Sequence, residues 1–174
     1  MTEAFRFAPQ TVTDSGLILC SGCTPARTCR LGIQGMRATG PDEVTFELAC
    51  ASEYEGTGGV AHGAWIAAVM DEAVGGLPQS QGVSCVTASL TVDYLAPVPL
   101  ERPLVLASRV ESREARRWSV VAELRLSSTG PVLARARARM VHPDPEHFAR
   151  YRVWLAEHGA CTPTDSSGQS TVQQ

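Results

Sequence analysis

The 174-residue chain contains no lysine and no asparagine, so all 15 of its basic residues are arginine. Without lysine, Schiff-base chemistry, pyridoxal-phosphate attachment and a P-loop lysine are excluded. Without asparagine, N-linked glycosylation is excluded. Any cationic binding site must be built from arginine, whose planar fork suits phosphate and carboxylate groups.

The composition is that of one globular domain, with 44% hydrophobic residues and a formal charge of -3. Residues 1–100 hold 4 arginines and 10 acidic residues (net -6), whereas residues 101–174 hold 11 arginines and 8 acidic residues (net +3). No basic run is interleaved with aromatic residues, so we expect no nucleic-acid partner. The arginines of the second half are still suited to a small anionic ligand.

The sequence has no apolar stretch near the roughly 18 residues that span a membrane, and its first residues lack the features of a signal peptide. We therefore expect a cytoplasmic protein without a membrane partner, whose cysteines are thiols. Cys20, Cys23 and Cys29 form a cluster that would bind zinc only if a nearby His or Cys completed it. No such residue is available, so we prefer small buried residues in a tight turn and expect no metal.

One long apolar helix is predicted over residues 62–77, ending at Gly75 and Gly76 with Pro78 beyond. It is apolar on nearly all sides, so we expect it to be buried. Apolar residues alternate in five segments that read as strands, over residues 42–50, 84–96, 104–113, 118–127 and 131–141. Short turns between consecutive strands favour an antiparallel sheet, and a curved sheet wrapped around the helix gives an α+β fold.

A second helix is predicted over residues 144–158, with Asp144 as N-cap, Pro145 at the first helical position and Gly159 as the stop.

Two polar residues interrupt the apolar helix region, His62 at its start and Asp71 within it. A buried carboxylate is costly unless it is paired or functional, although Asp71 could also face solvent. The helix start, with Gly58, Gly59 and Gly63 nearby, offers free N–H groups to an oxyanion or carbonyl. Taken alone, His62 reads more readily as a capping or packing residue than as a catalyst.

The spacing of His62 and Asp71 constrains any shared mechanism. Nine residues at 1.5 Å each separate them by about 13 Å along the helix, so they cannot act on one carbonyl within one chain. If both serve one reaction, a second subunit must bring its helix alongside in the antiparallel direction. The spacing therefore predicts a two-fold dimer with two equivalent sites.

The segments GGVAHGAWIAAVMDEAVG and VTASLTVDYLAPVP resemble those of the hot-dog-fold acyl-CoA thioesterases. The similarity is to the phenylacetate-type (PaaI-like) branch of the 4-hydroxybenzoyl-CoA thioesterase superfamily, and the upstream CSGC…RLG also looks like a segment of many members. The resemblance implies a hot-dog fold with a long buried central helix wrapped by a curved antiparallel sheet. The predicted boundaries are an N-terminal arm over residues 1–17, the hot-dog domain over 18–142, a C-terminal helix over 143–159 and a disordered tail over 160–174.

The same resemblance implies an acyl-CoA thioesterase that uses no cofactor, with coenzyme A as part of the substrate. Asp71 would be the general base or the nucleophile, and the Gly63 N–H would polarise the thioester carbonyl. His62 would help hold the carbonyl end, and Thr87 would position Asp71 or the water. Each site would combine His62 and Gly63 of one subunit with Asp71 and Thr87 of the other, in a homodimer that can pair further into a dimer of dimers.

The chain departs from the family pattern at three substrate-binding positions. The second Gly after the His is Ala64, and Trp65 stands where a smaller aliphatic residue is usual. Some relatives carry Asn or Gln six residues before the His, where this chain has Gly56.

Several points stay open at this stage. Strict alternation places Thr87 on the strand face opposite Val86, Ala88 and Leu90, so either a bulge lies near Ser84–Ala88 or the Thr face turns toward the partner's helix. Arginine must grip the coenzyme A phosphates, and the candidates named for this are Arg113, Arg116 and Arg117. For Arg135, Arg137 and Arg139 we prefer a solvated strand face paired with Glu111 and Glu123.

Two other functions compete with the thioesterase. The first is a non-catalytic acyl-CoA-binding hot-dog module, acting as a sensor or regulator. The second is a hot-dog hydratase or dehydratase, which would need an Asp and a His close together at a spacing that this chain lacks. Release of coenzyme A from a panel of acyl-CoAs separates the three.

Overall fold

The computed structural model describes residues 11–12, 18–19, 29–144 and 146–158. The predicted tail and most of the predicted N-terminal arm lie outside these residues, as do Cys20, Cys23, Pro145 and Gly159. Two compact units are present, one within Arg6–Pro143 and the other containing the C-terminal helix. We describe each unit by itself.

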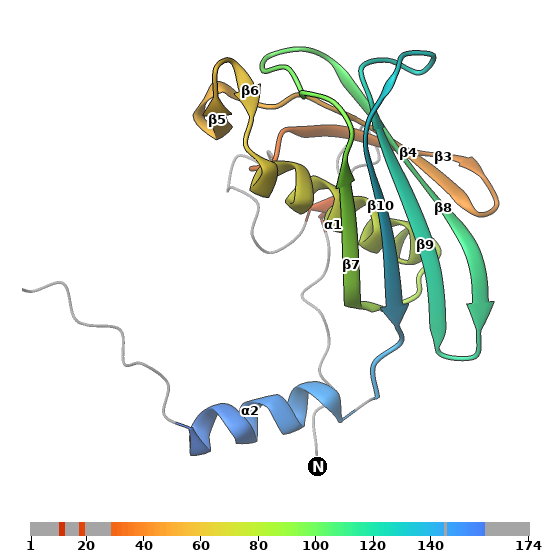
Figure 1. The fold of residues 1–174 in the computed structure, drawn as a ribbon. Helices are drawn as coiled ribbons and strands as arrows, with labels where there is room; N and C mark the ends of the chain where they lie inside the picture. The colour runs from red at the N-terminus through yellow and green to blue at the C-terminus, as the bar shows by residue number, and fades with distance from the viewer. Residues whose placement is uncertain (1–10, 13–17, 20–28, 145, 159–174) are drawn as a thin grey trace, which may run out of the picture. The chain divides into compact units, whose positions relative to one another are not determined.

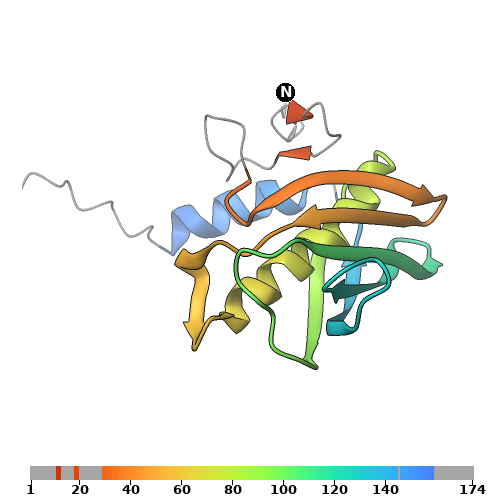
Figure 2. The ribbon, with the colours of Figure 1, turned by 90° about the horizontal axis from the view of Figure 1, so that it is seen from above.

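A six-stranded antiparallel sheet forms most of the larger unit (Figure 1). Its strands, in spatial order, are β3 (Ile33–Gly40), β4 (Glu43–Leu48), β8 (Leu104–Glu114), β9 (Arg117–Arg125), β10 (Val132–Val141) and β7 (Val86–Tyr94). The sheet bends around the long helix α1 (Gly63–Ser80), which packs on β4, β7, β8, β9 and β10 (Figure 2). The predicted α+β architecture of one long helix on a curved antiparallel sheet is confirmed.

Short elements precede the helix and the sheet. β1 (Thr11–Val12) pairs with β2 (Ile18–Leu19), within and just after the predicted arm. A 3-10 turn (Ser52–Tyr54) leads into β5 (Glu55–Thr57), which pairs with β6 (Val60–Ala61) immediately before α1. The glycine-containing segment before the helix is therefore a small hairpin, and it leads directly into the start of α1.

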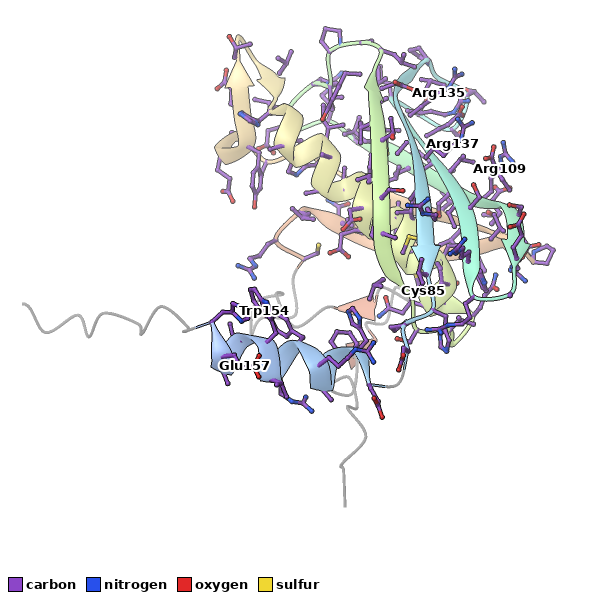
Figure 3. All side chains as sticks on the ribbon, turned by 60° about the horizontal axis from the view of Figure 1, so that its bottom comes forward. Cys85, Arg109, Arg135, Arg137, Trp154 and Glu157 are labelled. Carbon is purple, nitrogen blue, oxygen red and sulfur yellow. The ribbon has the colours of Figure 1, made fainter. Side chains whose placement is uncertain are left out.

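The two faces of the sheet differ because side chains alternate along each strand. On β10 the inner face carries Ala134, Ala136 and Ala138, all buried, and the outer face carries exposed arginines. Alanine on this central strand leaves room for the larger side chains of α1. Arg109, Arg135 and Arg137 point away from α1 on the other side of the sheet (Figure 3).

Helix α1 is buried on one side only, which corrects the expectation that it is covered all round. Its buried residues are Trp65, Ile66, Val69, Met70, Ala73, Val74, Leu77 and Pro78. The other side exposes Ala64, Asp71 and Glu72, because one curved sheet reaches around only part of the helix. In the part of the chain that the structure describes, no helix has the length and apolarity to cross a membrane.

The end of α1 was also predicted wrongly, because the helix passes through Gly75 and Gly76 and ends at Ser80. A β-carbon at Gly76 would lie 3.0 Å from the Phe46 ring, so the glycine serves close packing rather than termination. Pro78 is tolerated in the last turn, where its carbonyl accepts from the N–H groups of Gln81 and Val83. Tertiary packing outweighs the local stop signal here.

Strand β3 was missed from the sequence, so the sheet has one strand more than predicted. Its sequence, IQGMRATG, contains two glycines and has one buried residue, Ile33. Two register irregularities interrupt its pairing with β4. An edge strand with one weakly buried face carries little of the alternation that identifies a strand.

The second unit contains helix α2 (His147–Glu157), which begins two residues later than the predicted capping would give. Glu146 is the N-cap residue, although the Asp144 carboxylate still accepts from the Glu146 N–H at 2.8 Å. The carbonyl of Asp144 accepts from the His147 N–H at 2.9 Å. Asp144 therefore stabilises the turn that precedes the helix and is not its N-cap residue.

The Ser108 hydroxyl is the one buried side-chain polar atom of the described residues without a hydrogen-bond partner. Ser108 is 1% exposed on the inner face of β8, opposite Val44 and Ala122. An unpaired buried hydroxyl costs about 1–3 kcal/mol.

We expect Ser108→Ala to leave the free energy of unfolding unchanged or to raise it by about 1 kcal/mol in urea titrations. The reverse change in a matched place, Ala136→Ser, should destabilise the protein. A loss above about 1 kcal/mol in Ser108→Ala would contradict the assignment.

Candidate active site

His62 caps the start of α1. Its backbone N–H donates to the Tyr54 carbonyl at 2.8 Å, and its ring Nδ1 accepts from the Ala64 N–H at 3.0 Å. The two glycines of the β5–β6 turn, Gly58 and Gly59, have φ values of +53° and +82°, which lets the chain reverse just before the helix. The capping interpretation of His62 is thereby confirmed, with Nδ1 acting as the acceptor.

Gly63 presents an N–H at the start of the helix that the His62 cap does not use. It is the first helical residue, and its N–H has no acceptor among the residues that the structure describes. The neighbouring Ala64 N–H is already used by His62. An unpaired N–H at the positive end of a helix dipole suits a carbonyl oxygen that gains negative charge.

Asp71 lies on the open side of α1 and is exposed, with no hydrogen bond or ion pair to any described residue. It is eight residues beyond Gly63, about 12 Å along the helix, so the two groups are apart within one chain. Its neighbour Glu72 has much exposed surface, but protein packed around the carboxyl group raises the pKa of Glu72 by desolvation, and the Asp71 charge raises it further. Asp71 is therefore an available carboxylate on a small-residue surface.

Thr87 lies on the inner face of β7 because the strand contains a bulge. In the pairing with β10, Ser89 lies opposite Arg139 and Thr87 opposite Met140, so Ala88 is the extra residue. Opposed residues of an antiparallel pair share a face, and the Thr87 Oγ1 donates to Met140 Sδ at 3.6 Å. Of the two alternatives left open by the sequence, the bulge is the one observed.

Strand β7 is also an edge of the sheet. Its hydrogen-bonded neighbour in the described part of the chain is β10, and its other side carries no strand there. Six of its nine residues are exposed. A long edge with free N–H and C=O groups is a template for pairing with another strand.

The predicted substrate-binding residues around the helix start differ in how exposed they are and in what they contact. Ala64 is exposed at the start of α1. Trp65 is 2% exposed, and its indole N–H donates to the Leu31 carbonyl at 3.2 Å, so it ties the segment before β3 to the helix. Gly56 lies against His62, since a β-carbon there would come within 2.9 Å of the His62 Cα.

The three arginines named for coenzyme A phosphates lie around the β8–β9 hairpin. Arg113 donates to Asp42 and, at 2.8 Å, to Gln81, and its guanidinium stacks 4.1 Å from the Trp118 ring. Arg116 donates twice to the His142 carbonyl, at 3.1 and 2.8 Å. Arg117 is exposed and has no carboxylate partner in the described ranges.

The arginine row on β10 is paired as the sequence predicts. Arg135 lies 2.9 Å from Glu123, and Arg137 lies 3.4 Å from Glu111. The pKa of Glu123 is lowered: burial opposes ionisation, but Arg125 and Arg135 outweigh it. The preferred interpretation as a solvated, ion-paired strand face is confirmed for Arg135 and Arg137, whereas Arg139 is exposed and has no carboxylate partner among the described residues.

Two of the described cysteines, Cys50 and Cys85, are poor nucleophiles because burial disfavours their thiolates. Burial raises the pKa of Cys50 to about 11, with the Glu101 charge adding to the effect, and burial also raises the pKa of Cys85. A thiol with a raised pKa is a weak nucleophile at neutral pH. Cys29 is free, and the described residues contain no cluster of His, Cys, Asp or Glu that could hold a metal ion.

Tyr94 lies beside the candidate site, although the sequence alone did not single it out. Its hydroxyl donates to the Gly63 carbonyl at 3.2 Å, and its ring would lie 3.6 Å from a β-carbon at Gly63. It is 54% exposed although it points to the inner side of the sheet. Its position at the strand end, just before Pro97 and Pro99, is the signal that could have placed it near a site.

A curved antiparallel sheet around one long helix, with an uncapped N–H at the helix start, defines the chain as a hot-dog domain protein. Residues 58–142 match the sequence profile of the Thioesterase superfamily. The acyl-coenzyme A thioesterase THEM4 of Mus musculus is 30% identical over 92 residues, which are 53% of this chain but only 40% of the mouse protein.

Two solved structures have the same fold. The E. coli PaaI protein from the phenylacetic acid degradation operon aligns with a TM-score of 0.60 and 18% identity over 66% of this chain and 81% of its own. The smu.793 protein of Streptococcus mutans, solved bound to acetyl CoA, aligns with a TM-score of 0.57 and 20% identity over 62% of this chain and 86% of its own. The predicted relationship to hot-dog thioesterases of the PaaI-like kind is confirmed.

Proposed function

We propose that the protein hydrolyses acyl-CoA thioesters to a free acid and coenzyme A. The observation that carries the proposal is that α1 offers a Gly63 N–H at its start and an exposed Asp71 carboxylate eight residues later, neither with a partner among the described residues. The match of residues 58–142 to the Thioesterase superfamily and the likeness to an acyl-CoA thioesterase support this choice of substrate.

In the proposed reaction the thioester carbonyl oxygen accepts a hydrogen bond from the Gly63 N–H. Asp71 removes a proton from a water molecule as that water attacks the carbonyl carbon, or attacks the carbon itself to give an anhydride that water then opens. In the first route the C–S bond breaks after the water has added, the sulfur leaves with the electron pair, and it takes up the proton that Asp71 removed from the water. In the second route the C–S bond breaks as the anhydride forms, and the sulfur takes up a proton from the water that opens the anhydride. The thioester is already activated, so neither a metal nor a cofactor is required.

The proposal requires two subunits at each site. Reacting atoms must come within about 3–3.5 Å, whereas Gly63 and Asp71 of one chain are about 12 Å apart along the helix. An antiparallel α1 from a second copy would bring its Asp71 beside the first copy's Gly63. The free edge of β7 and the small residues on the open side of α1, Ala64, Ala67, Ala68 and Gly75, suit such a two-fold contact.

The remaining residues take supporting roles in this proposal. Thr87, turned inward by the bulge, positions Asp71 or the attacking water within its own subunit. His62 keeps the helix start in place beneath the carbonyl. Among the arginines named for coenzyme A, Arg117 is the strongest candidate for a phosphate, since Arg113 and Arg116 already have protein partners.

The deciding experiment measures coenzyme A release by the purified protein from acyl-CoAs with short, long and aromatic acyl groups. Hydrolysis of at least one of them, by a dimer or larger assembly in light scattering, is the expected result. Binding of the whole panel without turnover would favour the non-catalytic acyl-CoA-binding module instead. A fully active monomer would overturn the shared site.

The close approach of Gly56 to His62 gives a further prediction. In Gly56→Ala the new methyl group would come within 2.9 Å of the His62 Cα, so the β5–β6 hairpin or the helix start must move. Because small displacements at a reacting centre are costly, we expect coenzyme A release to fall by about 10-fold or more. Gly40→Ala is the matched control, since its methyl group meets Glu43 at an ordinary 3.6 Å. Equal activity of the two variants would refute the steric role of Gly56.

A further inference from the structure

The site as built from the helix start has one hydrogen-bond donor fewer than acyl-transfer sites generally use. A negatively charged tetrahedral oxygen is usually held by two or more preorganised donors. Here the Gly63 N–H is free, but the adjacent Ala64 N–H donates to His62 Nδ1 at 3.0 Å. Freeing that N–H would break the cap that stabilises the helix start, so a second donor from another element is the better solution.

Tyr94 places a hydroxyl beside Gly63. Its Oη lies 3.2 Å from the Gly63 carbonyl oxygen and 3.8 Å from where a β-carbon of Gly63 would stand. The ring therefore lies against the first residue of the helix without crowding it. The ring stays 54% exposed, so a ligand at the Gly63 N–H can reach the hydroxyl.

The backbone around Tyr94 is held firmly enough to preorganise that hydroxyl. Tyr94 is the last residue of β7 and pairs with Ala134, whose small side chain leaves space on the inner face. The two residues that follow, Leu95 and Ala96, both donate their N–H groups to the Leu133 carbonyl, at 2.9 and 3.0 Å. The ring therefore projects from a fixed strand end rather than from a loop.

We propose that the Tyr94 hydroxyl is the second donor to the thioester carbonyl oxygen. This inference rests on the proposed thioesterase function. On substrate binding the phenolic O–H rotates from the Gly63 carbonyl to the substrate oxygen, and the Gly63 carbonyl keeps its partner within the helix. No proton is transferred; the hydrogen bond strengthens as negative charge builds on the oxygen.

The test compares wild type with Tyr94→Phe, which keeps the ring and removes only the donor. We expect kcat to fall by about 10- to 100-fold, with KM and Tm little changed, because the lost interaction is strongest in the transition state. A thioether analogue, an S-alkyl coenzyme A without the carbonyl oxygen, should bind both proteins equally. Tyr151→Phe, a change at an exposed tyrosine of α2, is the matched control and should keep full activity.

The outcomes are distinguishable. An inactive wild type would remove the proposed function itself. An active wild type with an equally active Tyr94→Phe variant would overturn the donor role alone. A variant in which kcat, the affinity for the thioether analogue and Tm all fall would also overturn the donor role. Such a result would show that the hydroxyl only stabilises the helix start.

Discussion

Replacing Asp71 with Asn is expected to lower kcat for coenzyme A release by about 10²- to 10⁴-fold, the usual loss for a missing general base. The amide keeps the size and position of the side chain but can neither accept the proton of the attacking water nor form the anhydride. Because Asp71 is exposed and has no partner in the described part of the subunit, the fold should not depend on it. The measurement is steady-state hydrolysis of the best acyl-CoA of the panel, with circular dichroism to confirm folding.

Glu72→Gln is the matched control because it removes a carboxylate from the adjacent position of the same helix. The Glu72 side chain points toward the β3 side of α1, as does Gly76 one turn later, which meets Phe46 and Met36. We expect this variant to retain at least about half of the wild-type kcat, a change well below that of a lost general base. If both variants lose activity to the same extent, the reaction depends on the negative charge of the helix in general. The proposal that Asp71 is the base or the nucleophile would then be refuted.

Replacing Gly63 with Pro should lower kcat by about 10²- to 10³-fold, the typical effect of deleting one oxyanion donor. Proline lacks the N–H that is proposed to hold the carbonyl oxygen. The first position of a helix accepts proline well, and the preceding His62 already has ψ of 139°, in the range that a following proline requires. The change therefore removes the donor without an evident reason for the helix to unfold.

The control for this experiment is Gly63→Ala, which keeps the N–H. Its methyl group would meet the Tyr94 ring at 3.6 Å, an ordinary contact. We expect Gly63→Ala to have kcat within about 10-fold of wild type, clearly above the proline variant. If the alanine variant is as inactive as the proline variant, the space above Gly63 rather than its N–H is what the reaction needs.

Much of the fold could be predicted because alternation and periodicity are strong in its central elements. The run of Ala134, Ala136 and Ala138 between arginines fixes both the strand and its faces. The apolar helix is equally clear, although its end is not, because Gly76 and Pro78 act through packing against neighbours distant in the sequence. Strand β3 has no such pattern and is defined by pairing with β4.

Part of the candidate site could likewise be predicted from the sequence, and part of it depends on the tertiary structure. His62, Gly63 and Asp71 are found from one continuous segment, and their spacing alone argues for two subunits. The inward turn of Thr87 depends on the bulge at Ala88, which appears only in the register with β10. The contact of Tyr94 with Gly63 joins residues 31 positions apart, so no local pattern announces it.

The sequence by itself determined the chemistry available to this protein. The missing lysine restricts phosphate binding to arginine, and the missing asparagine removes a side chain that relatives place near the helix start. Only the tertiary structure decided which groups are free. His62 occupies the Ala64 N–H, and Asp42, Gln81 and the His142 carbonyl occupy Arg113 and Arg116. Whether a group is free depends on contacts between distant segments, whereas residue type does not. For this reason the proposed site rests on Gly63, Asp71, Thr87 and Tyr94.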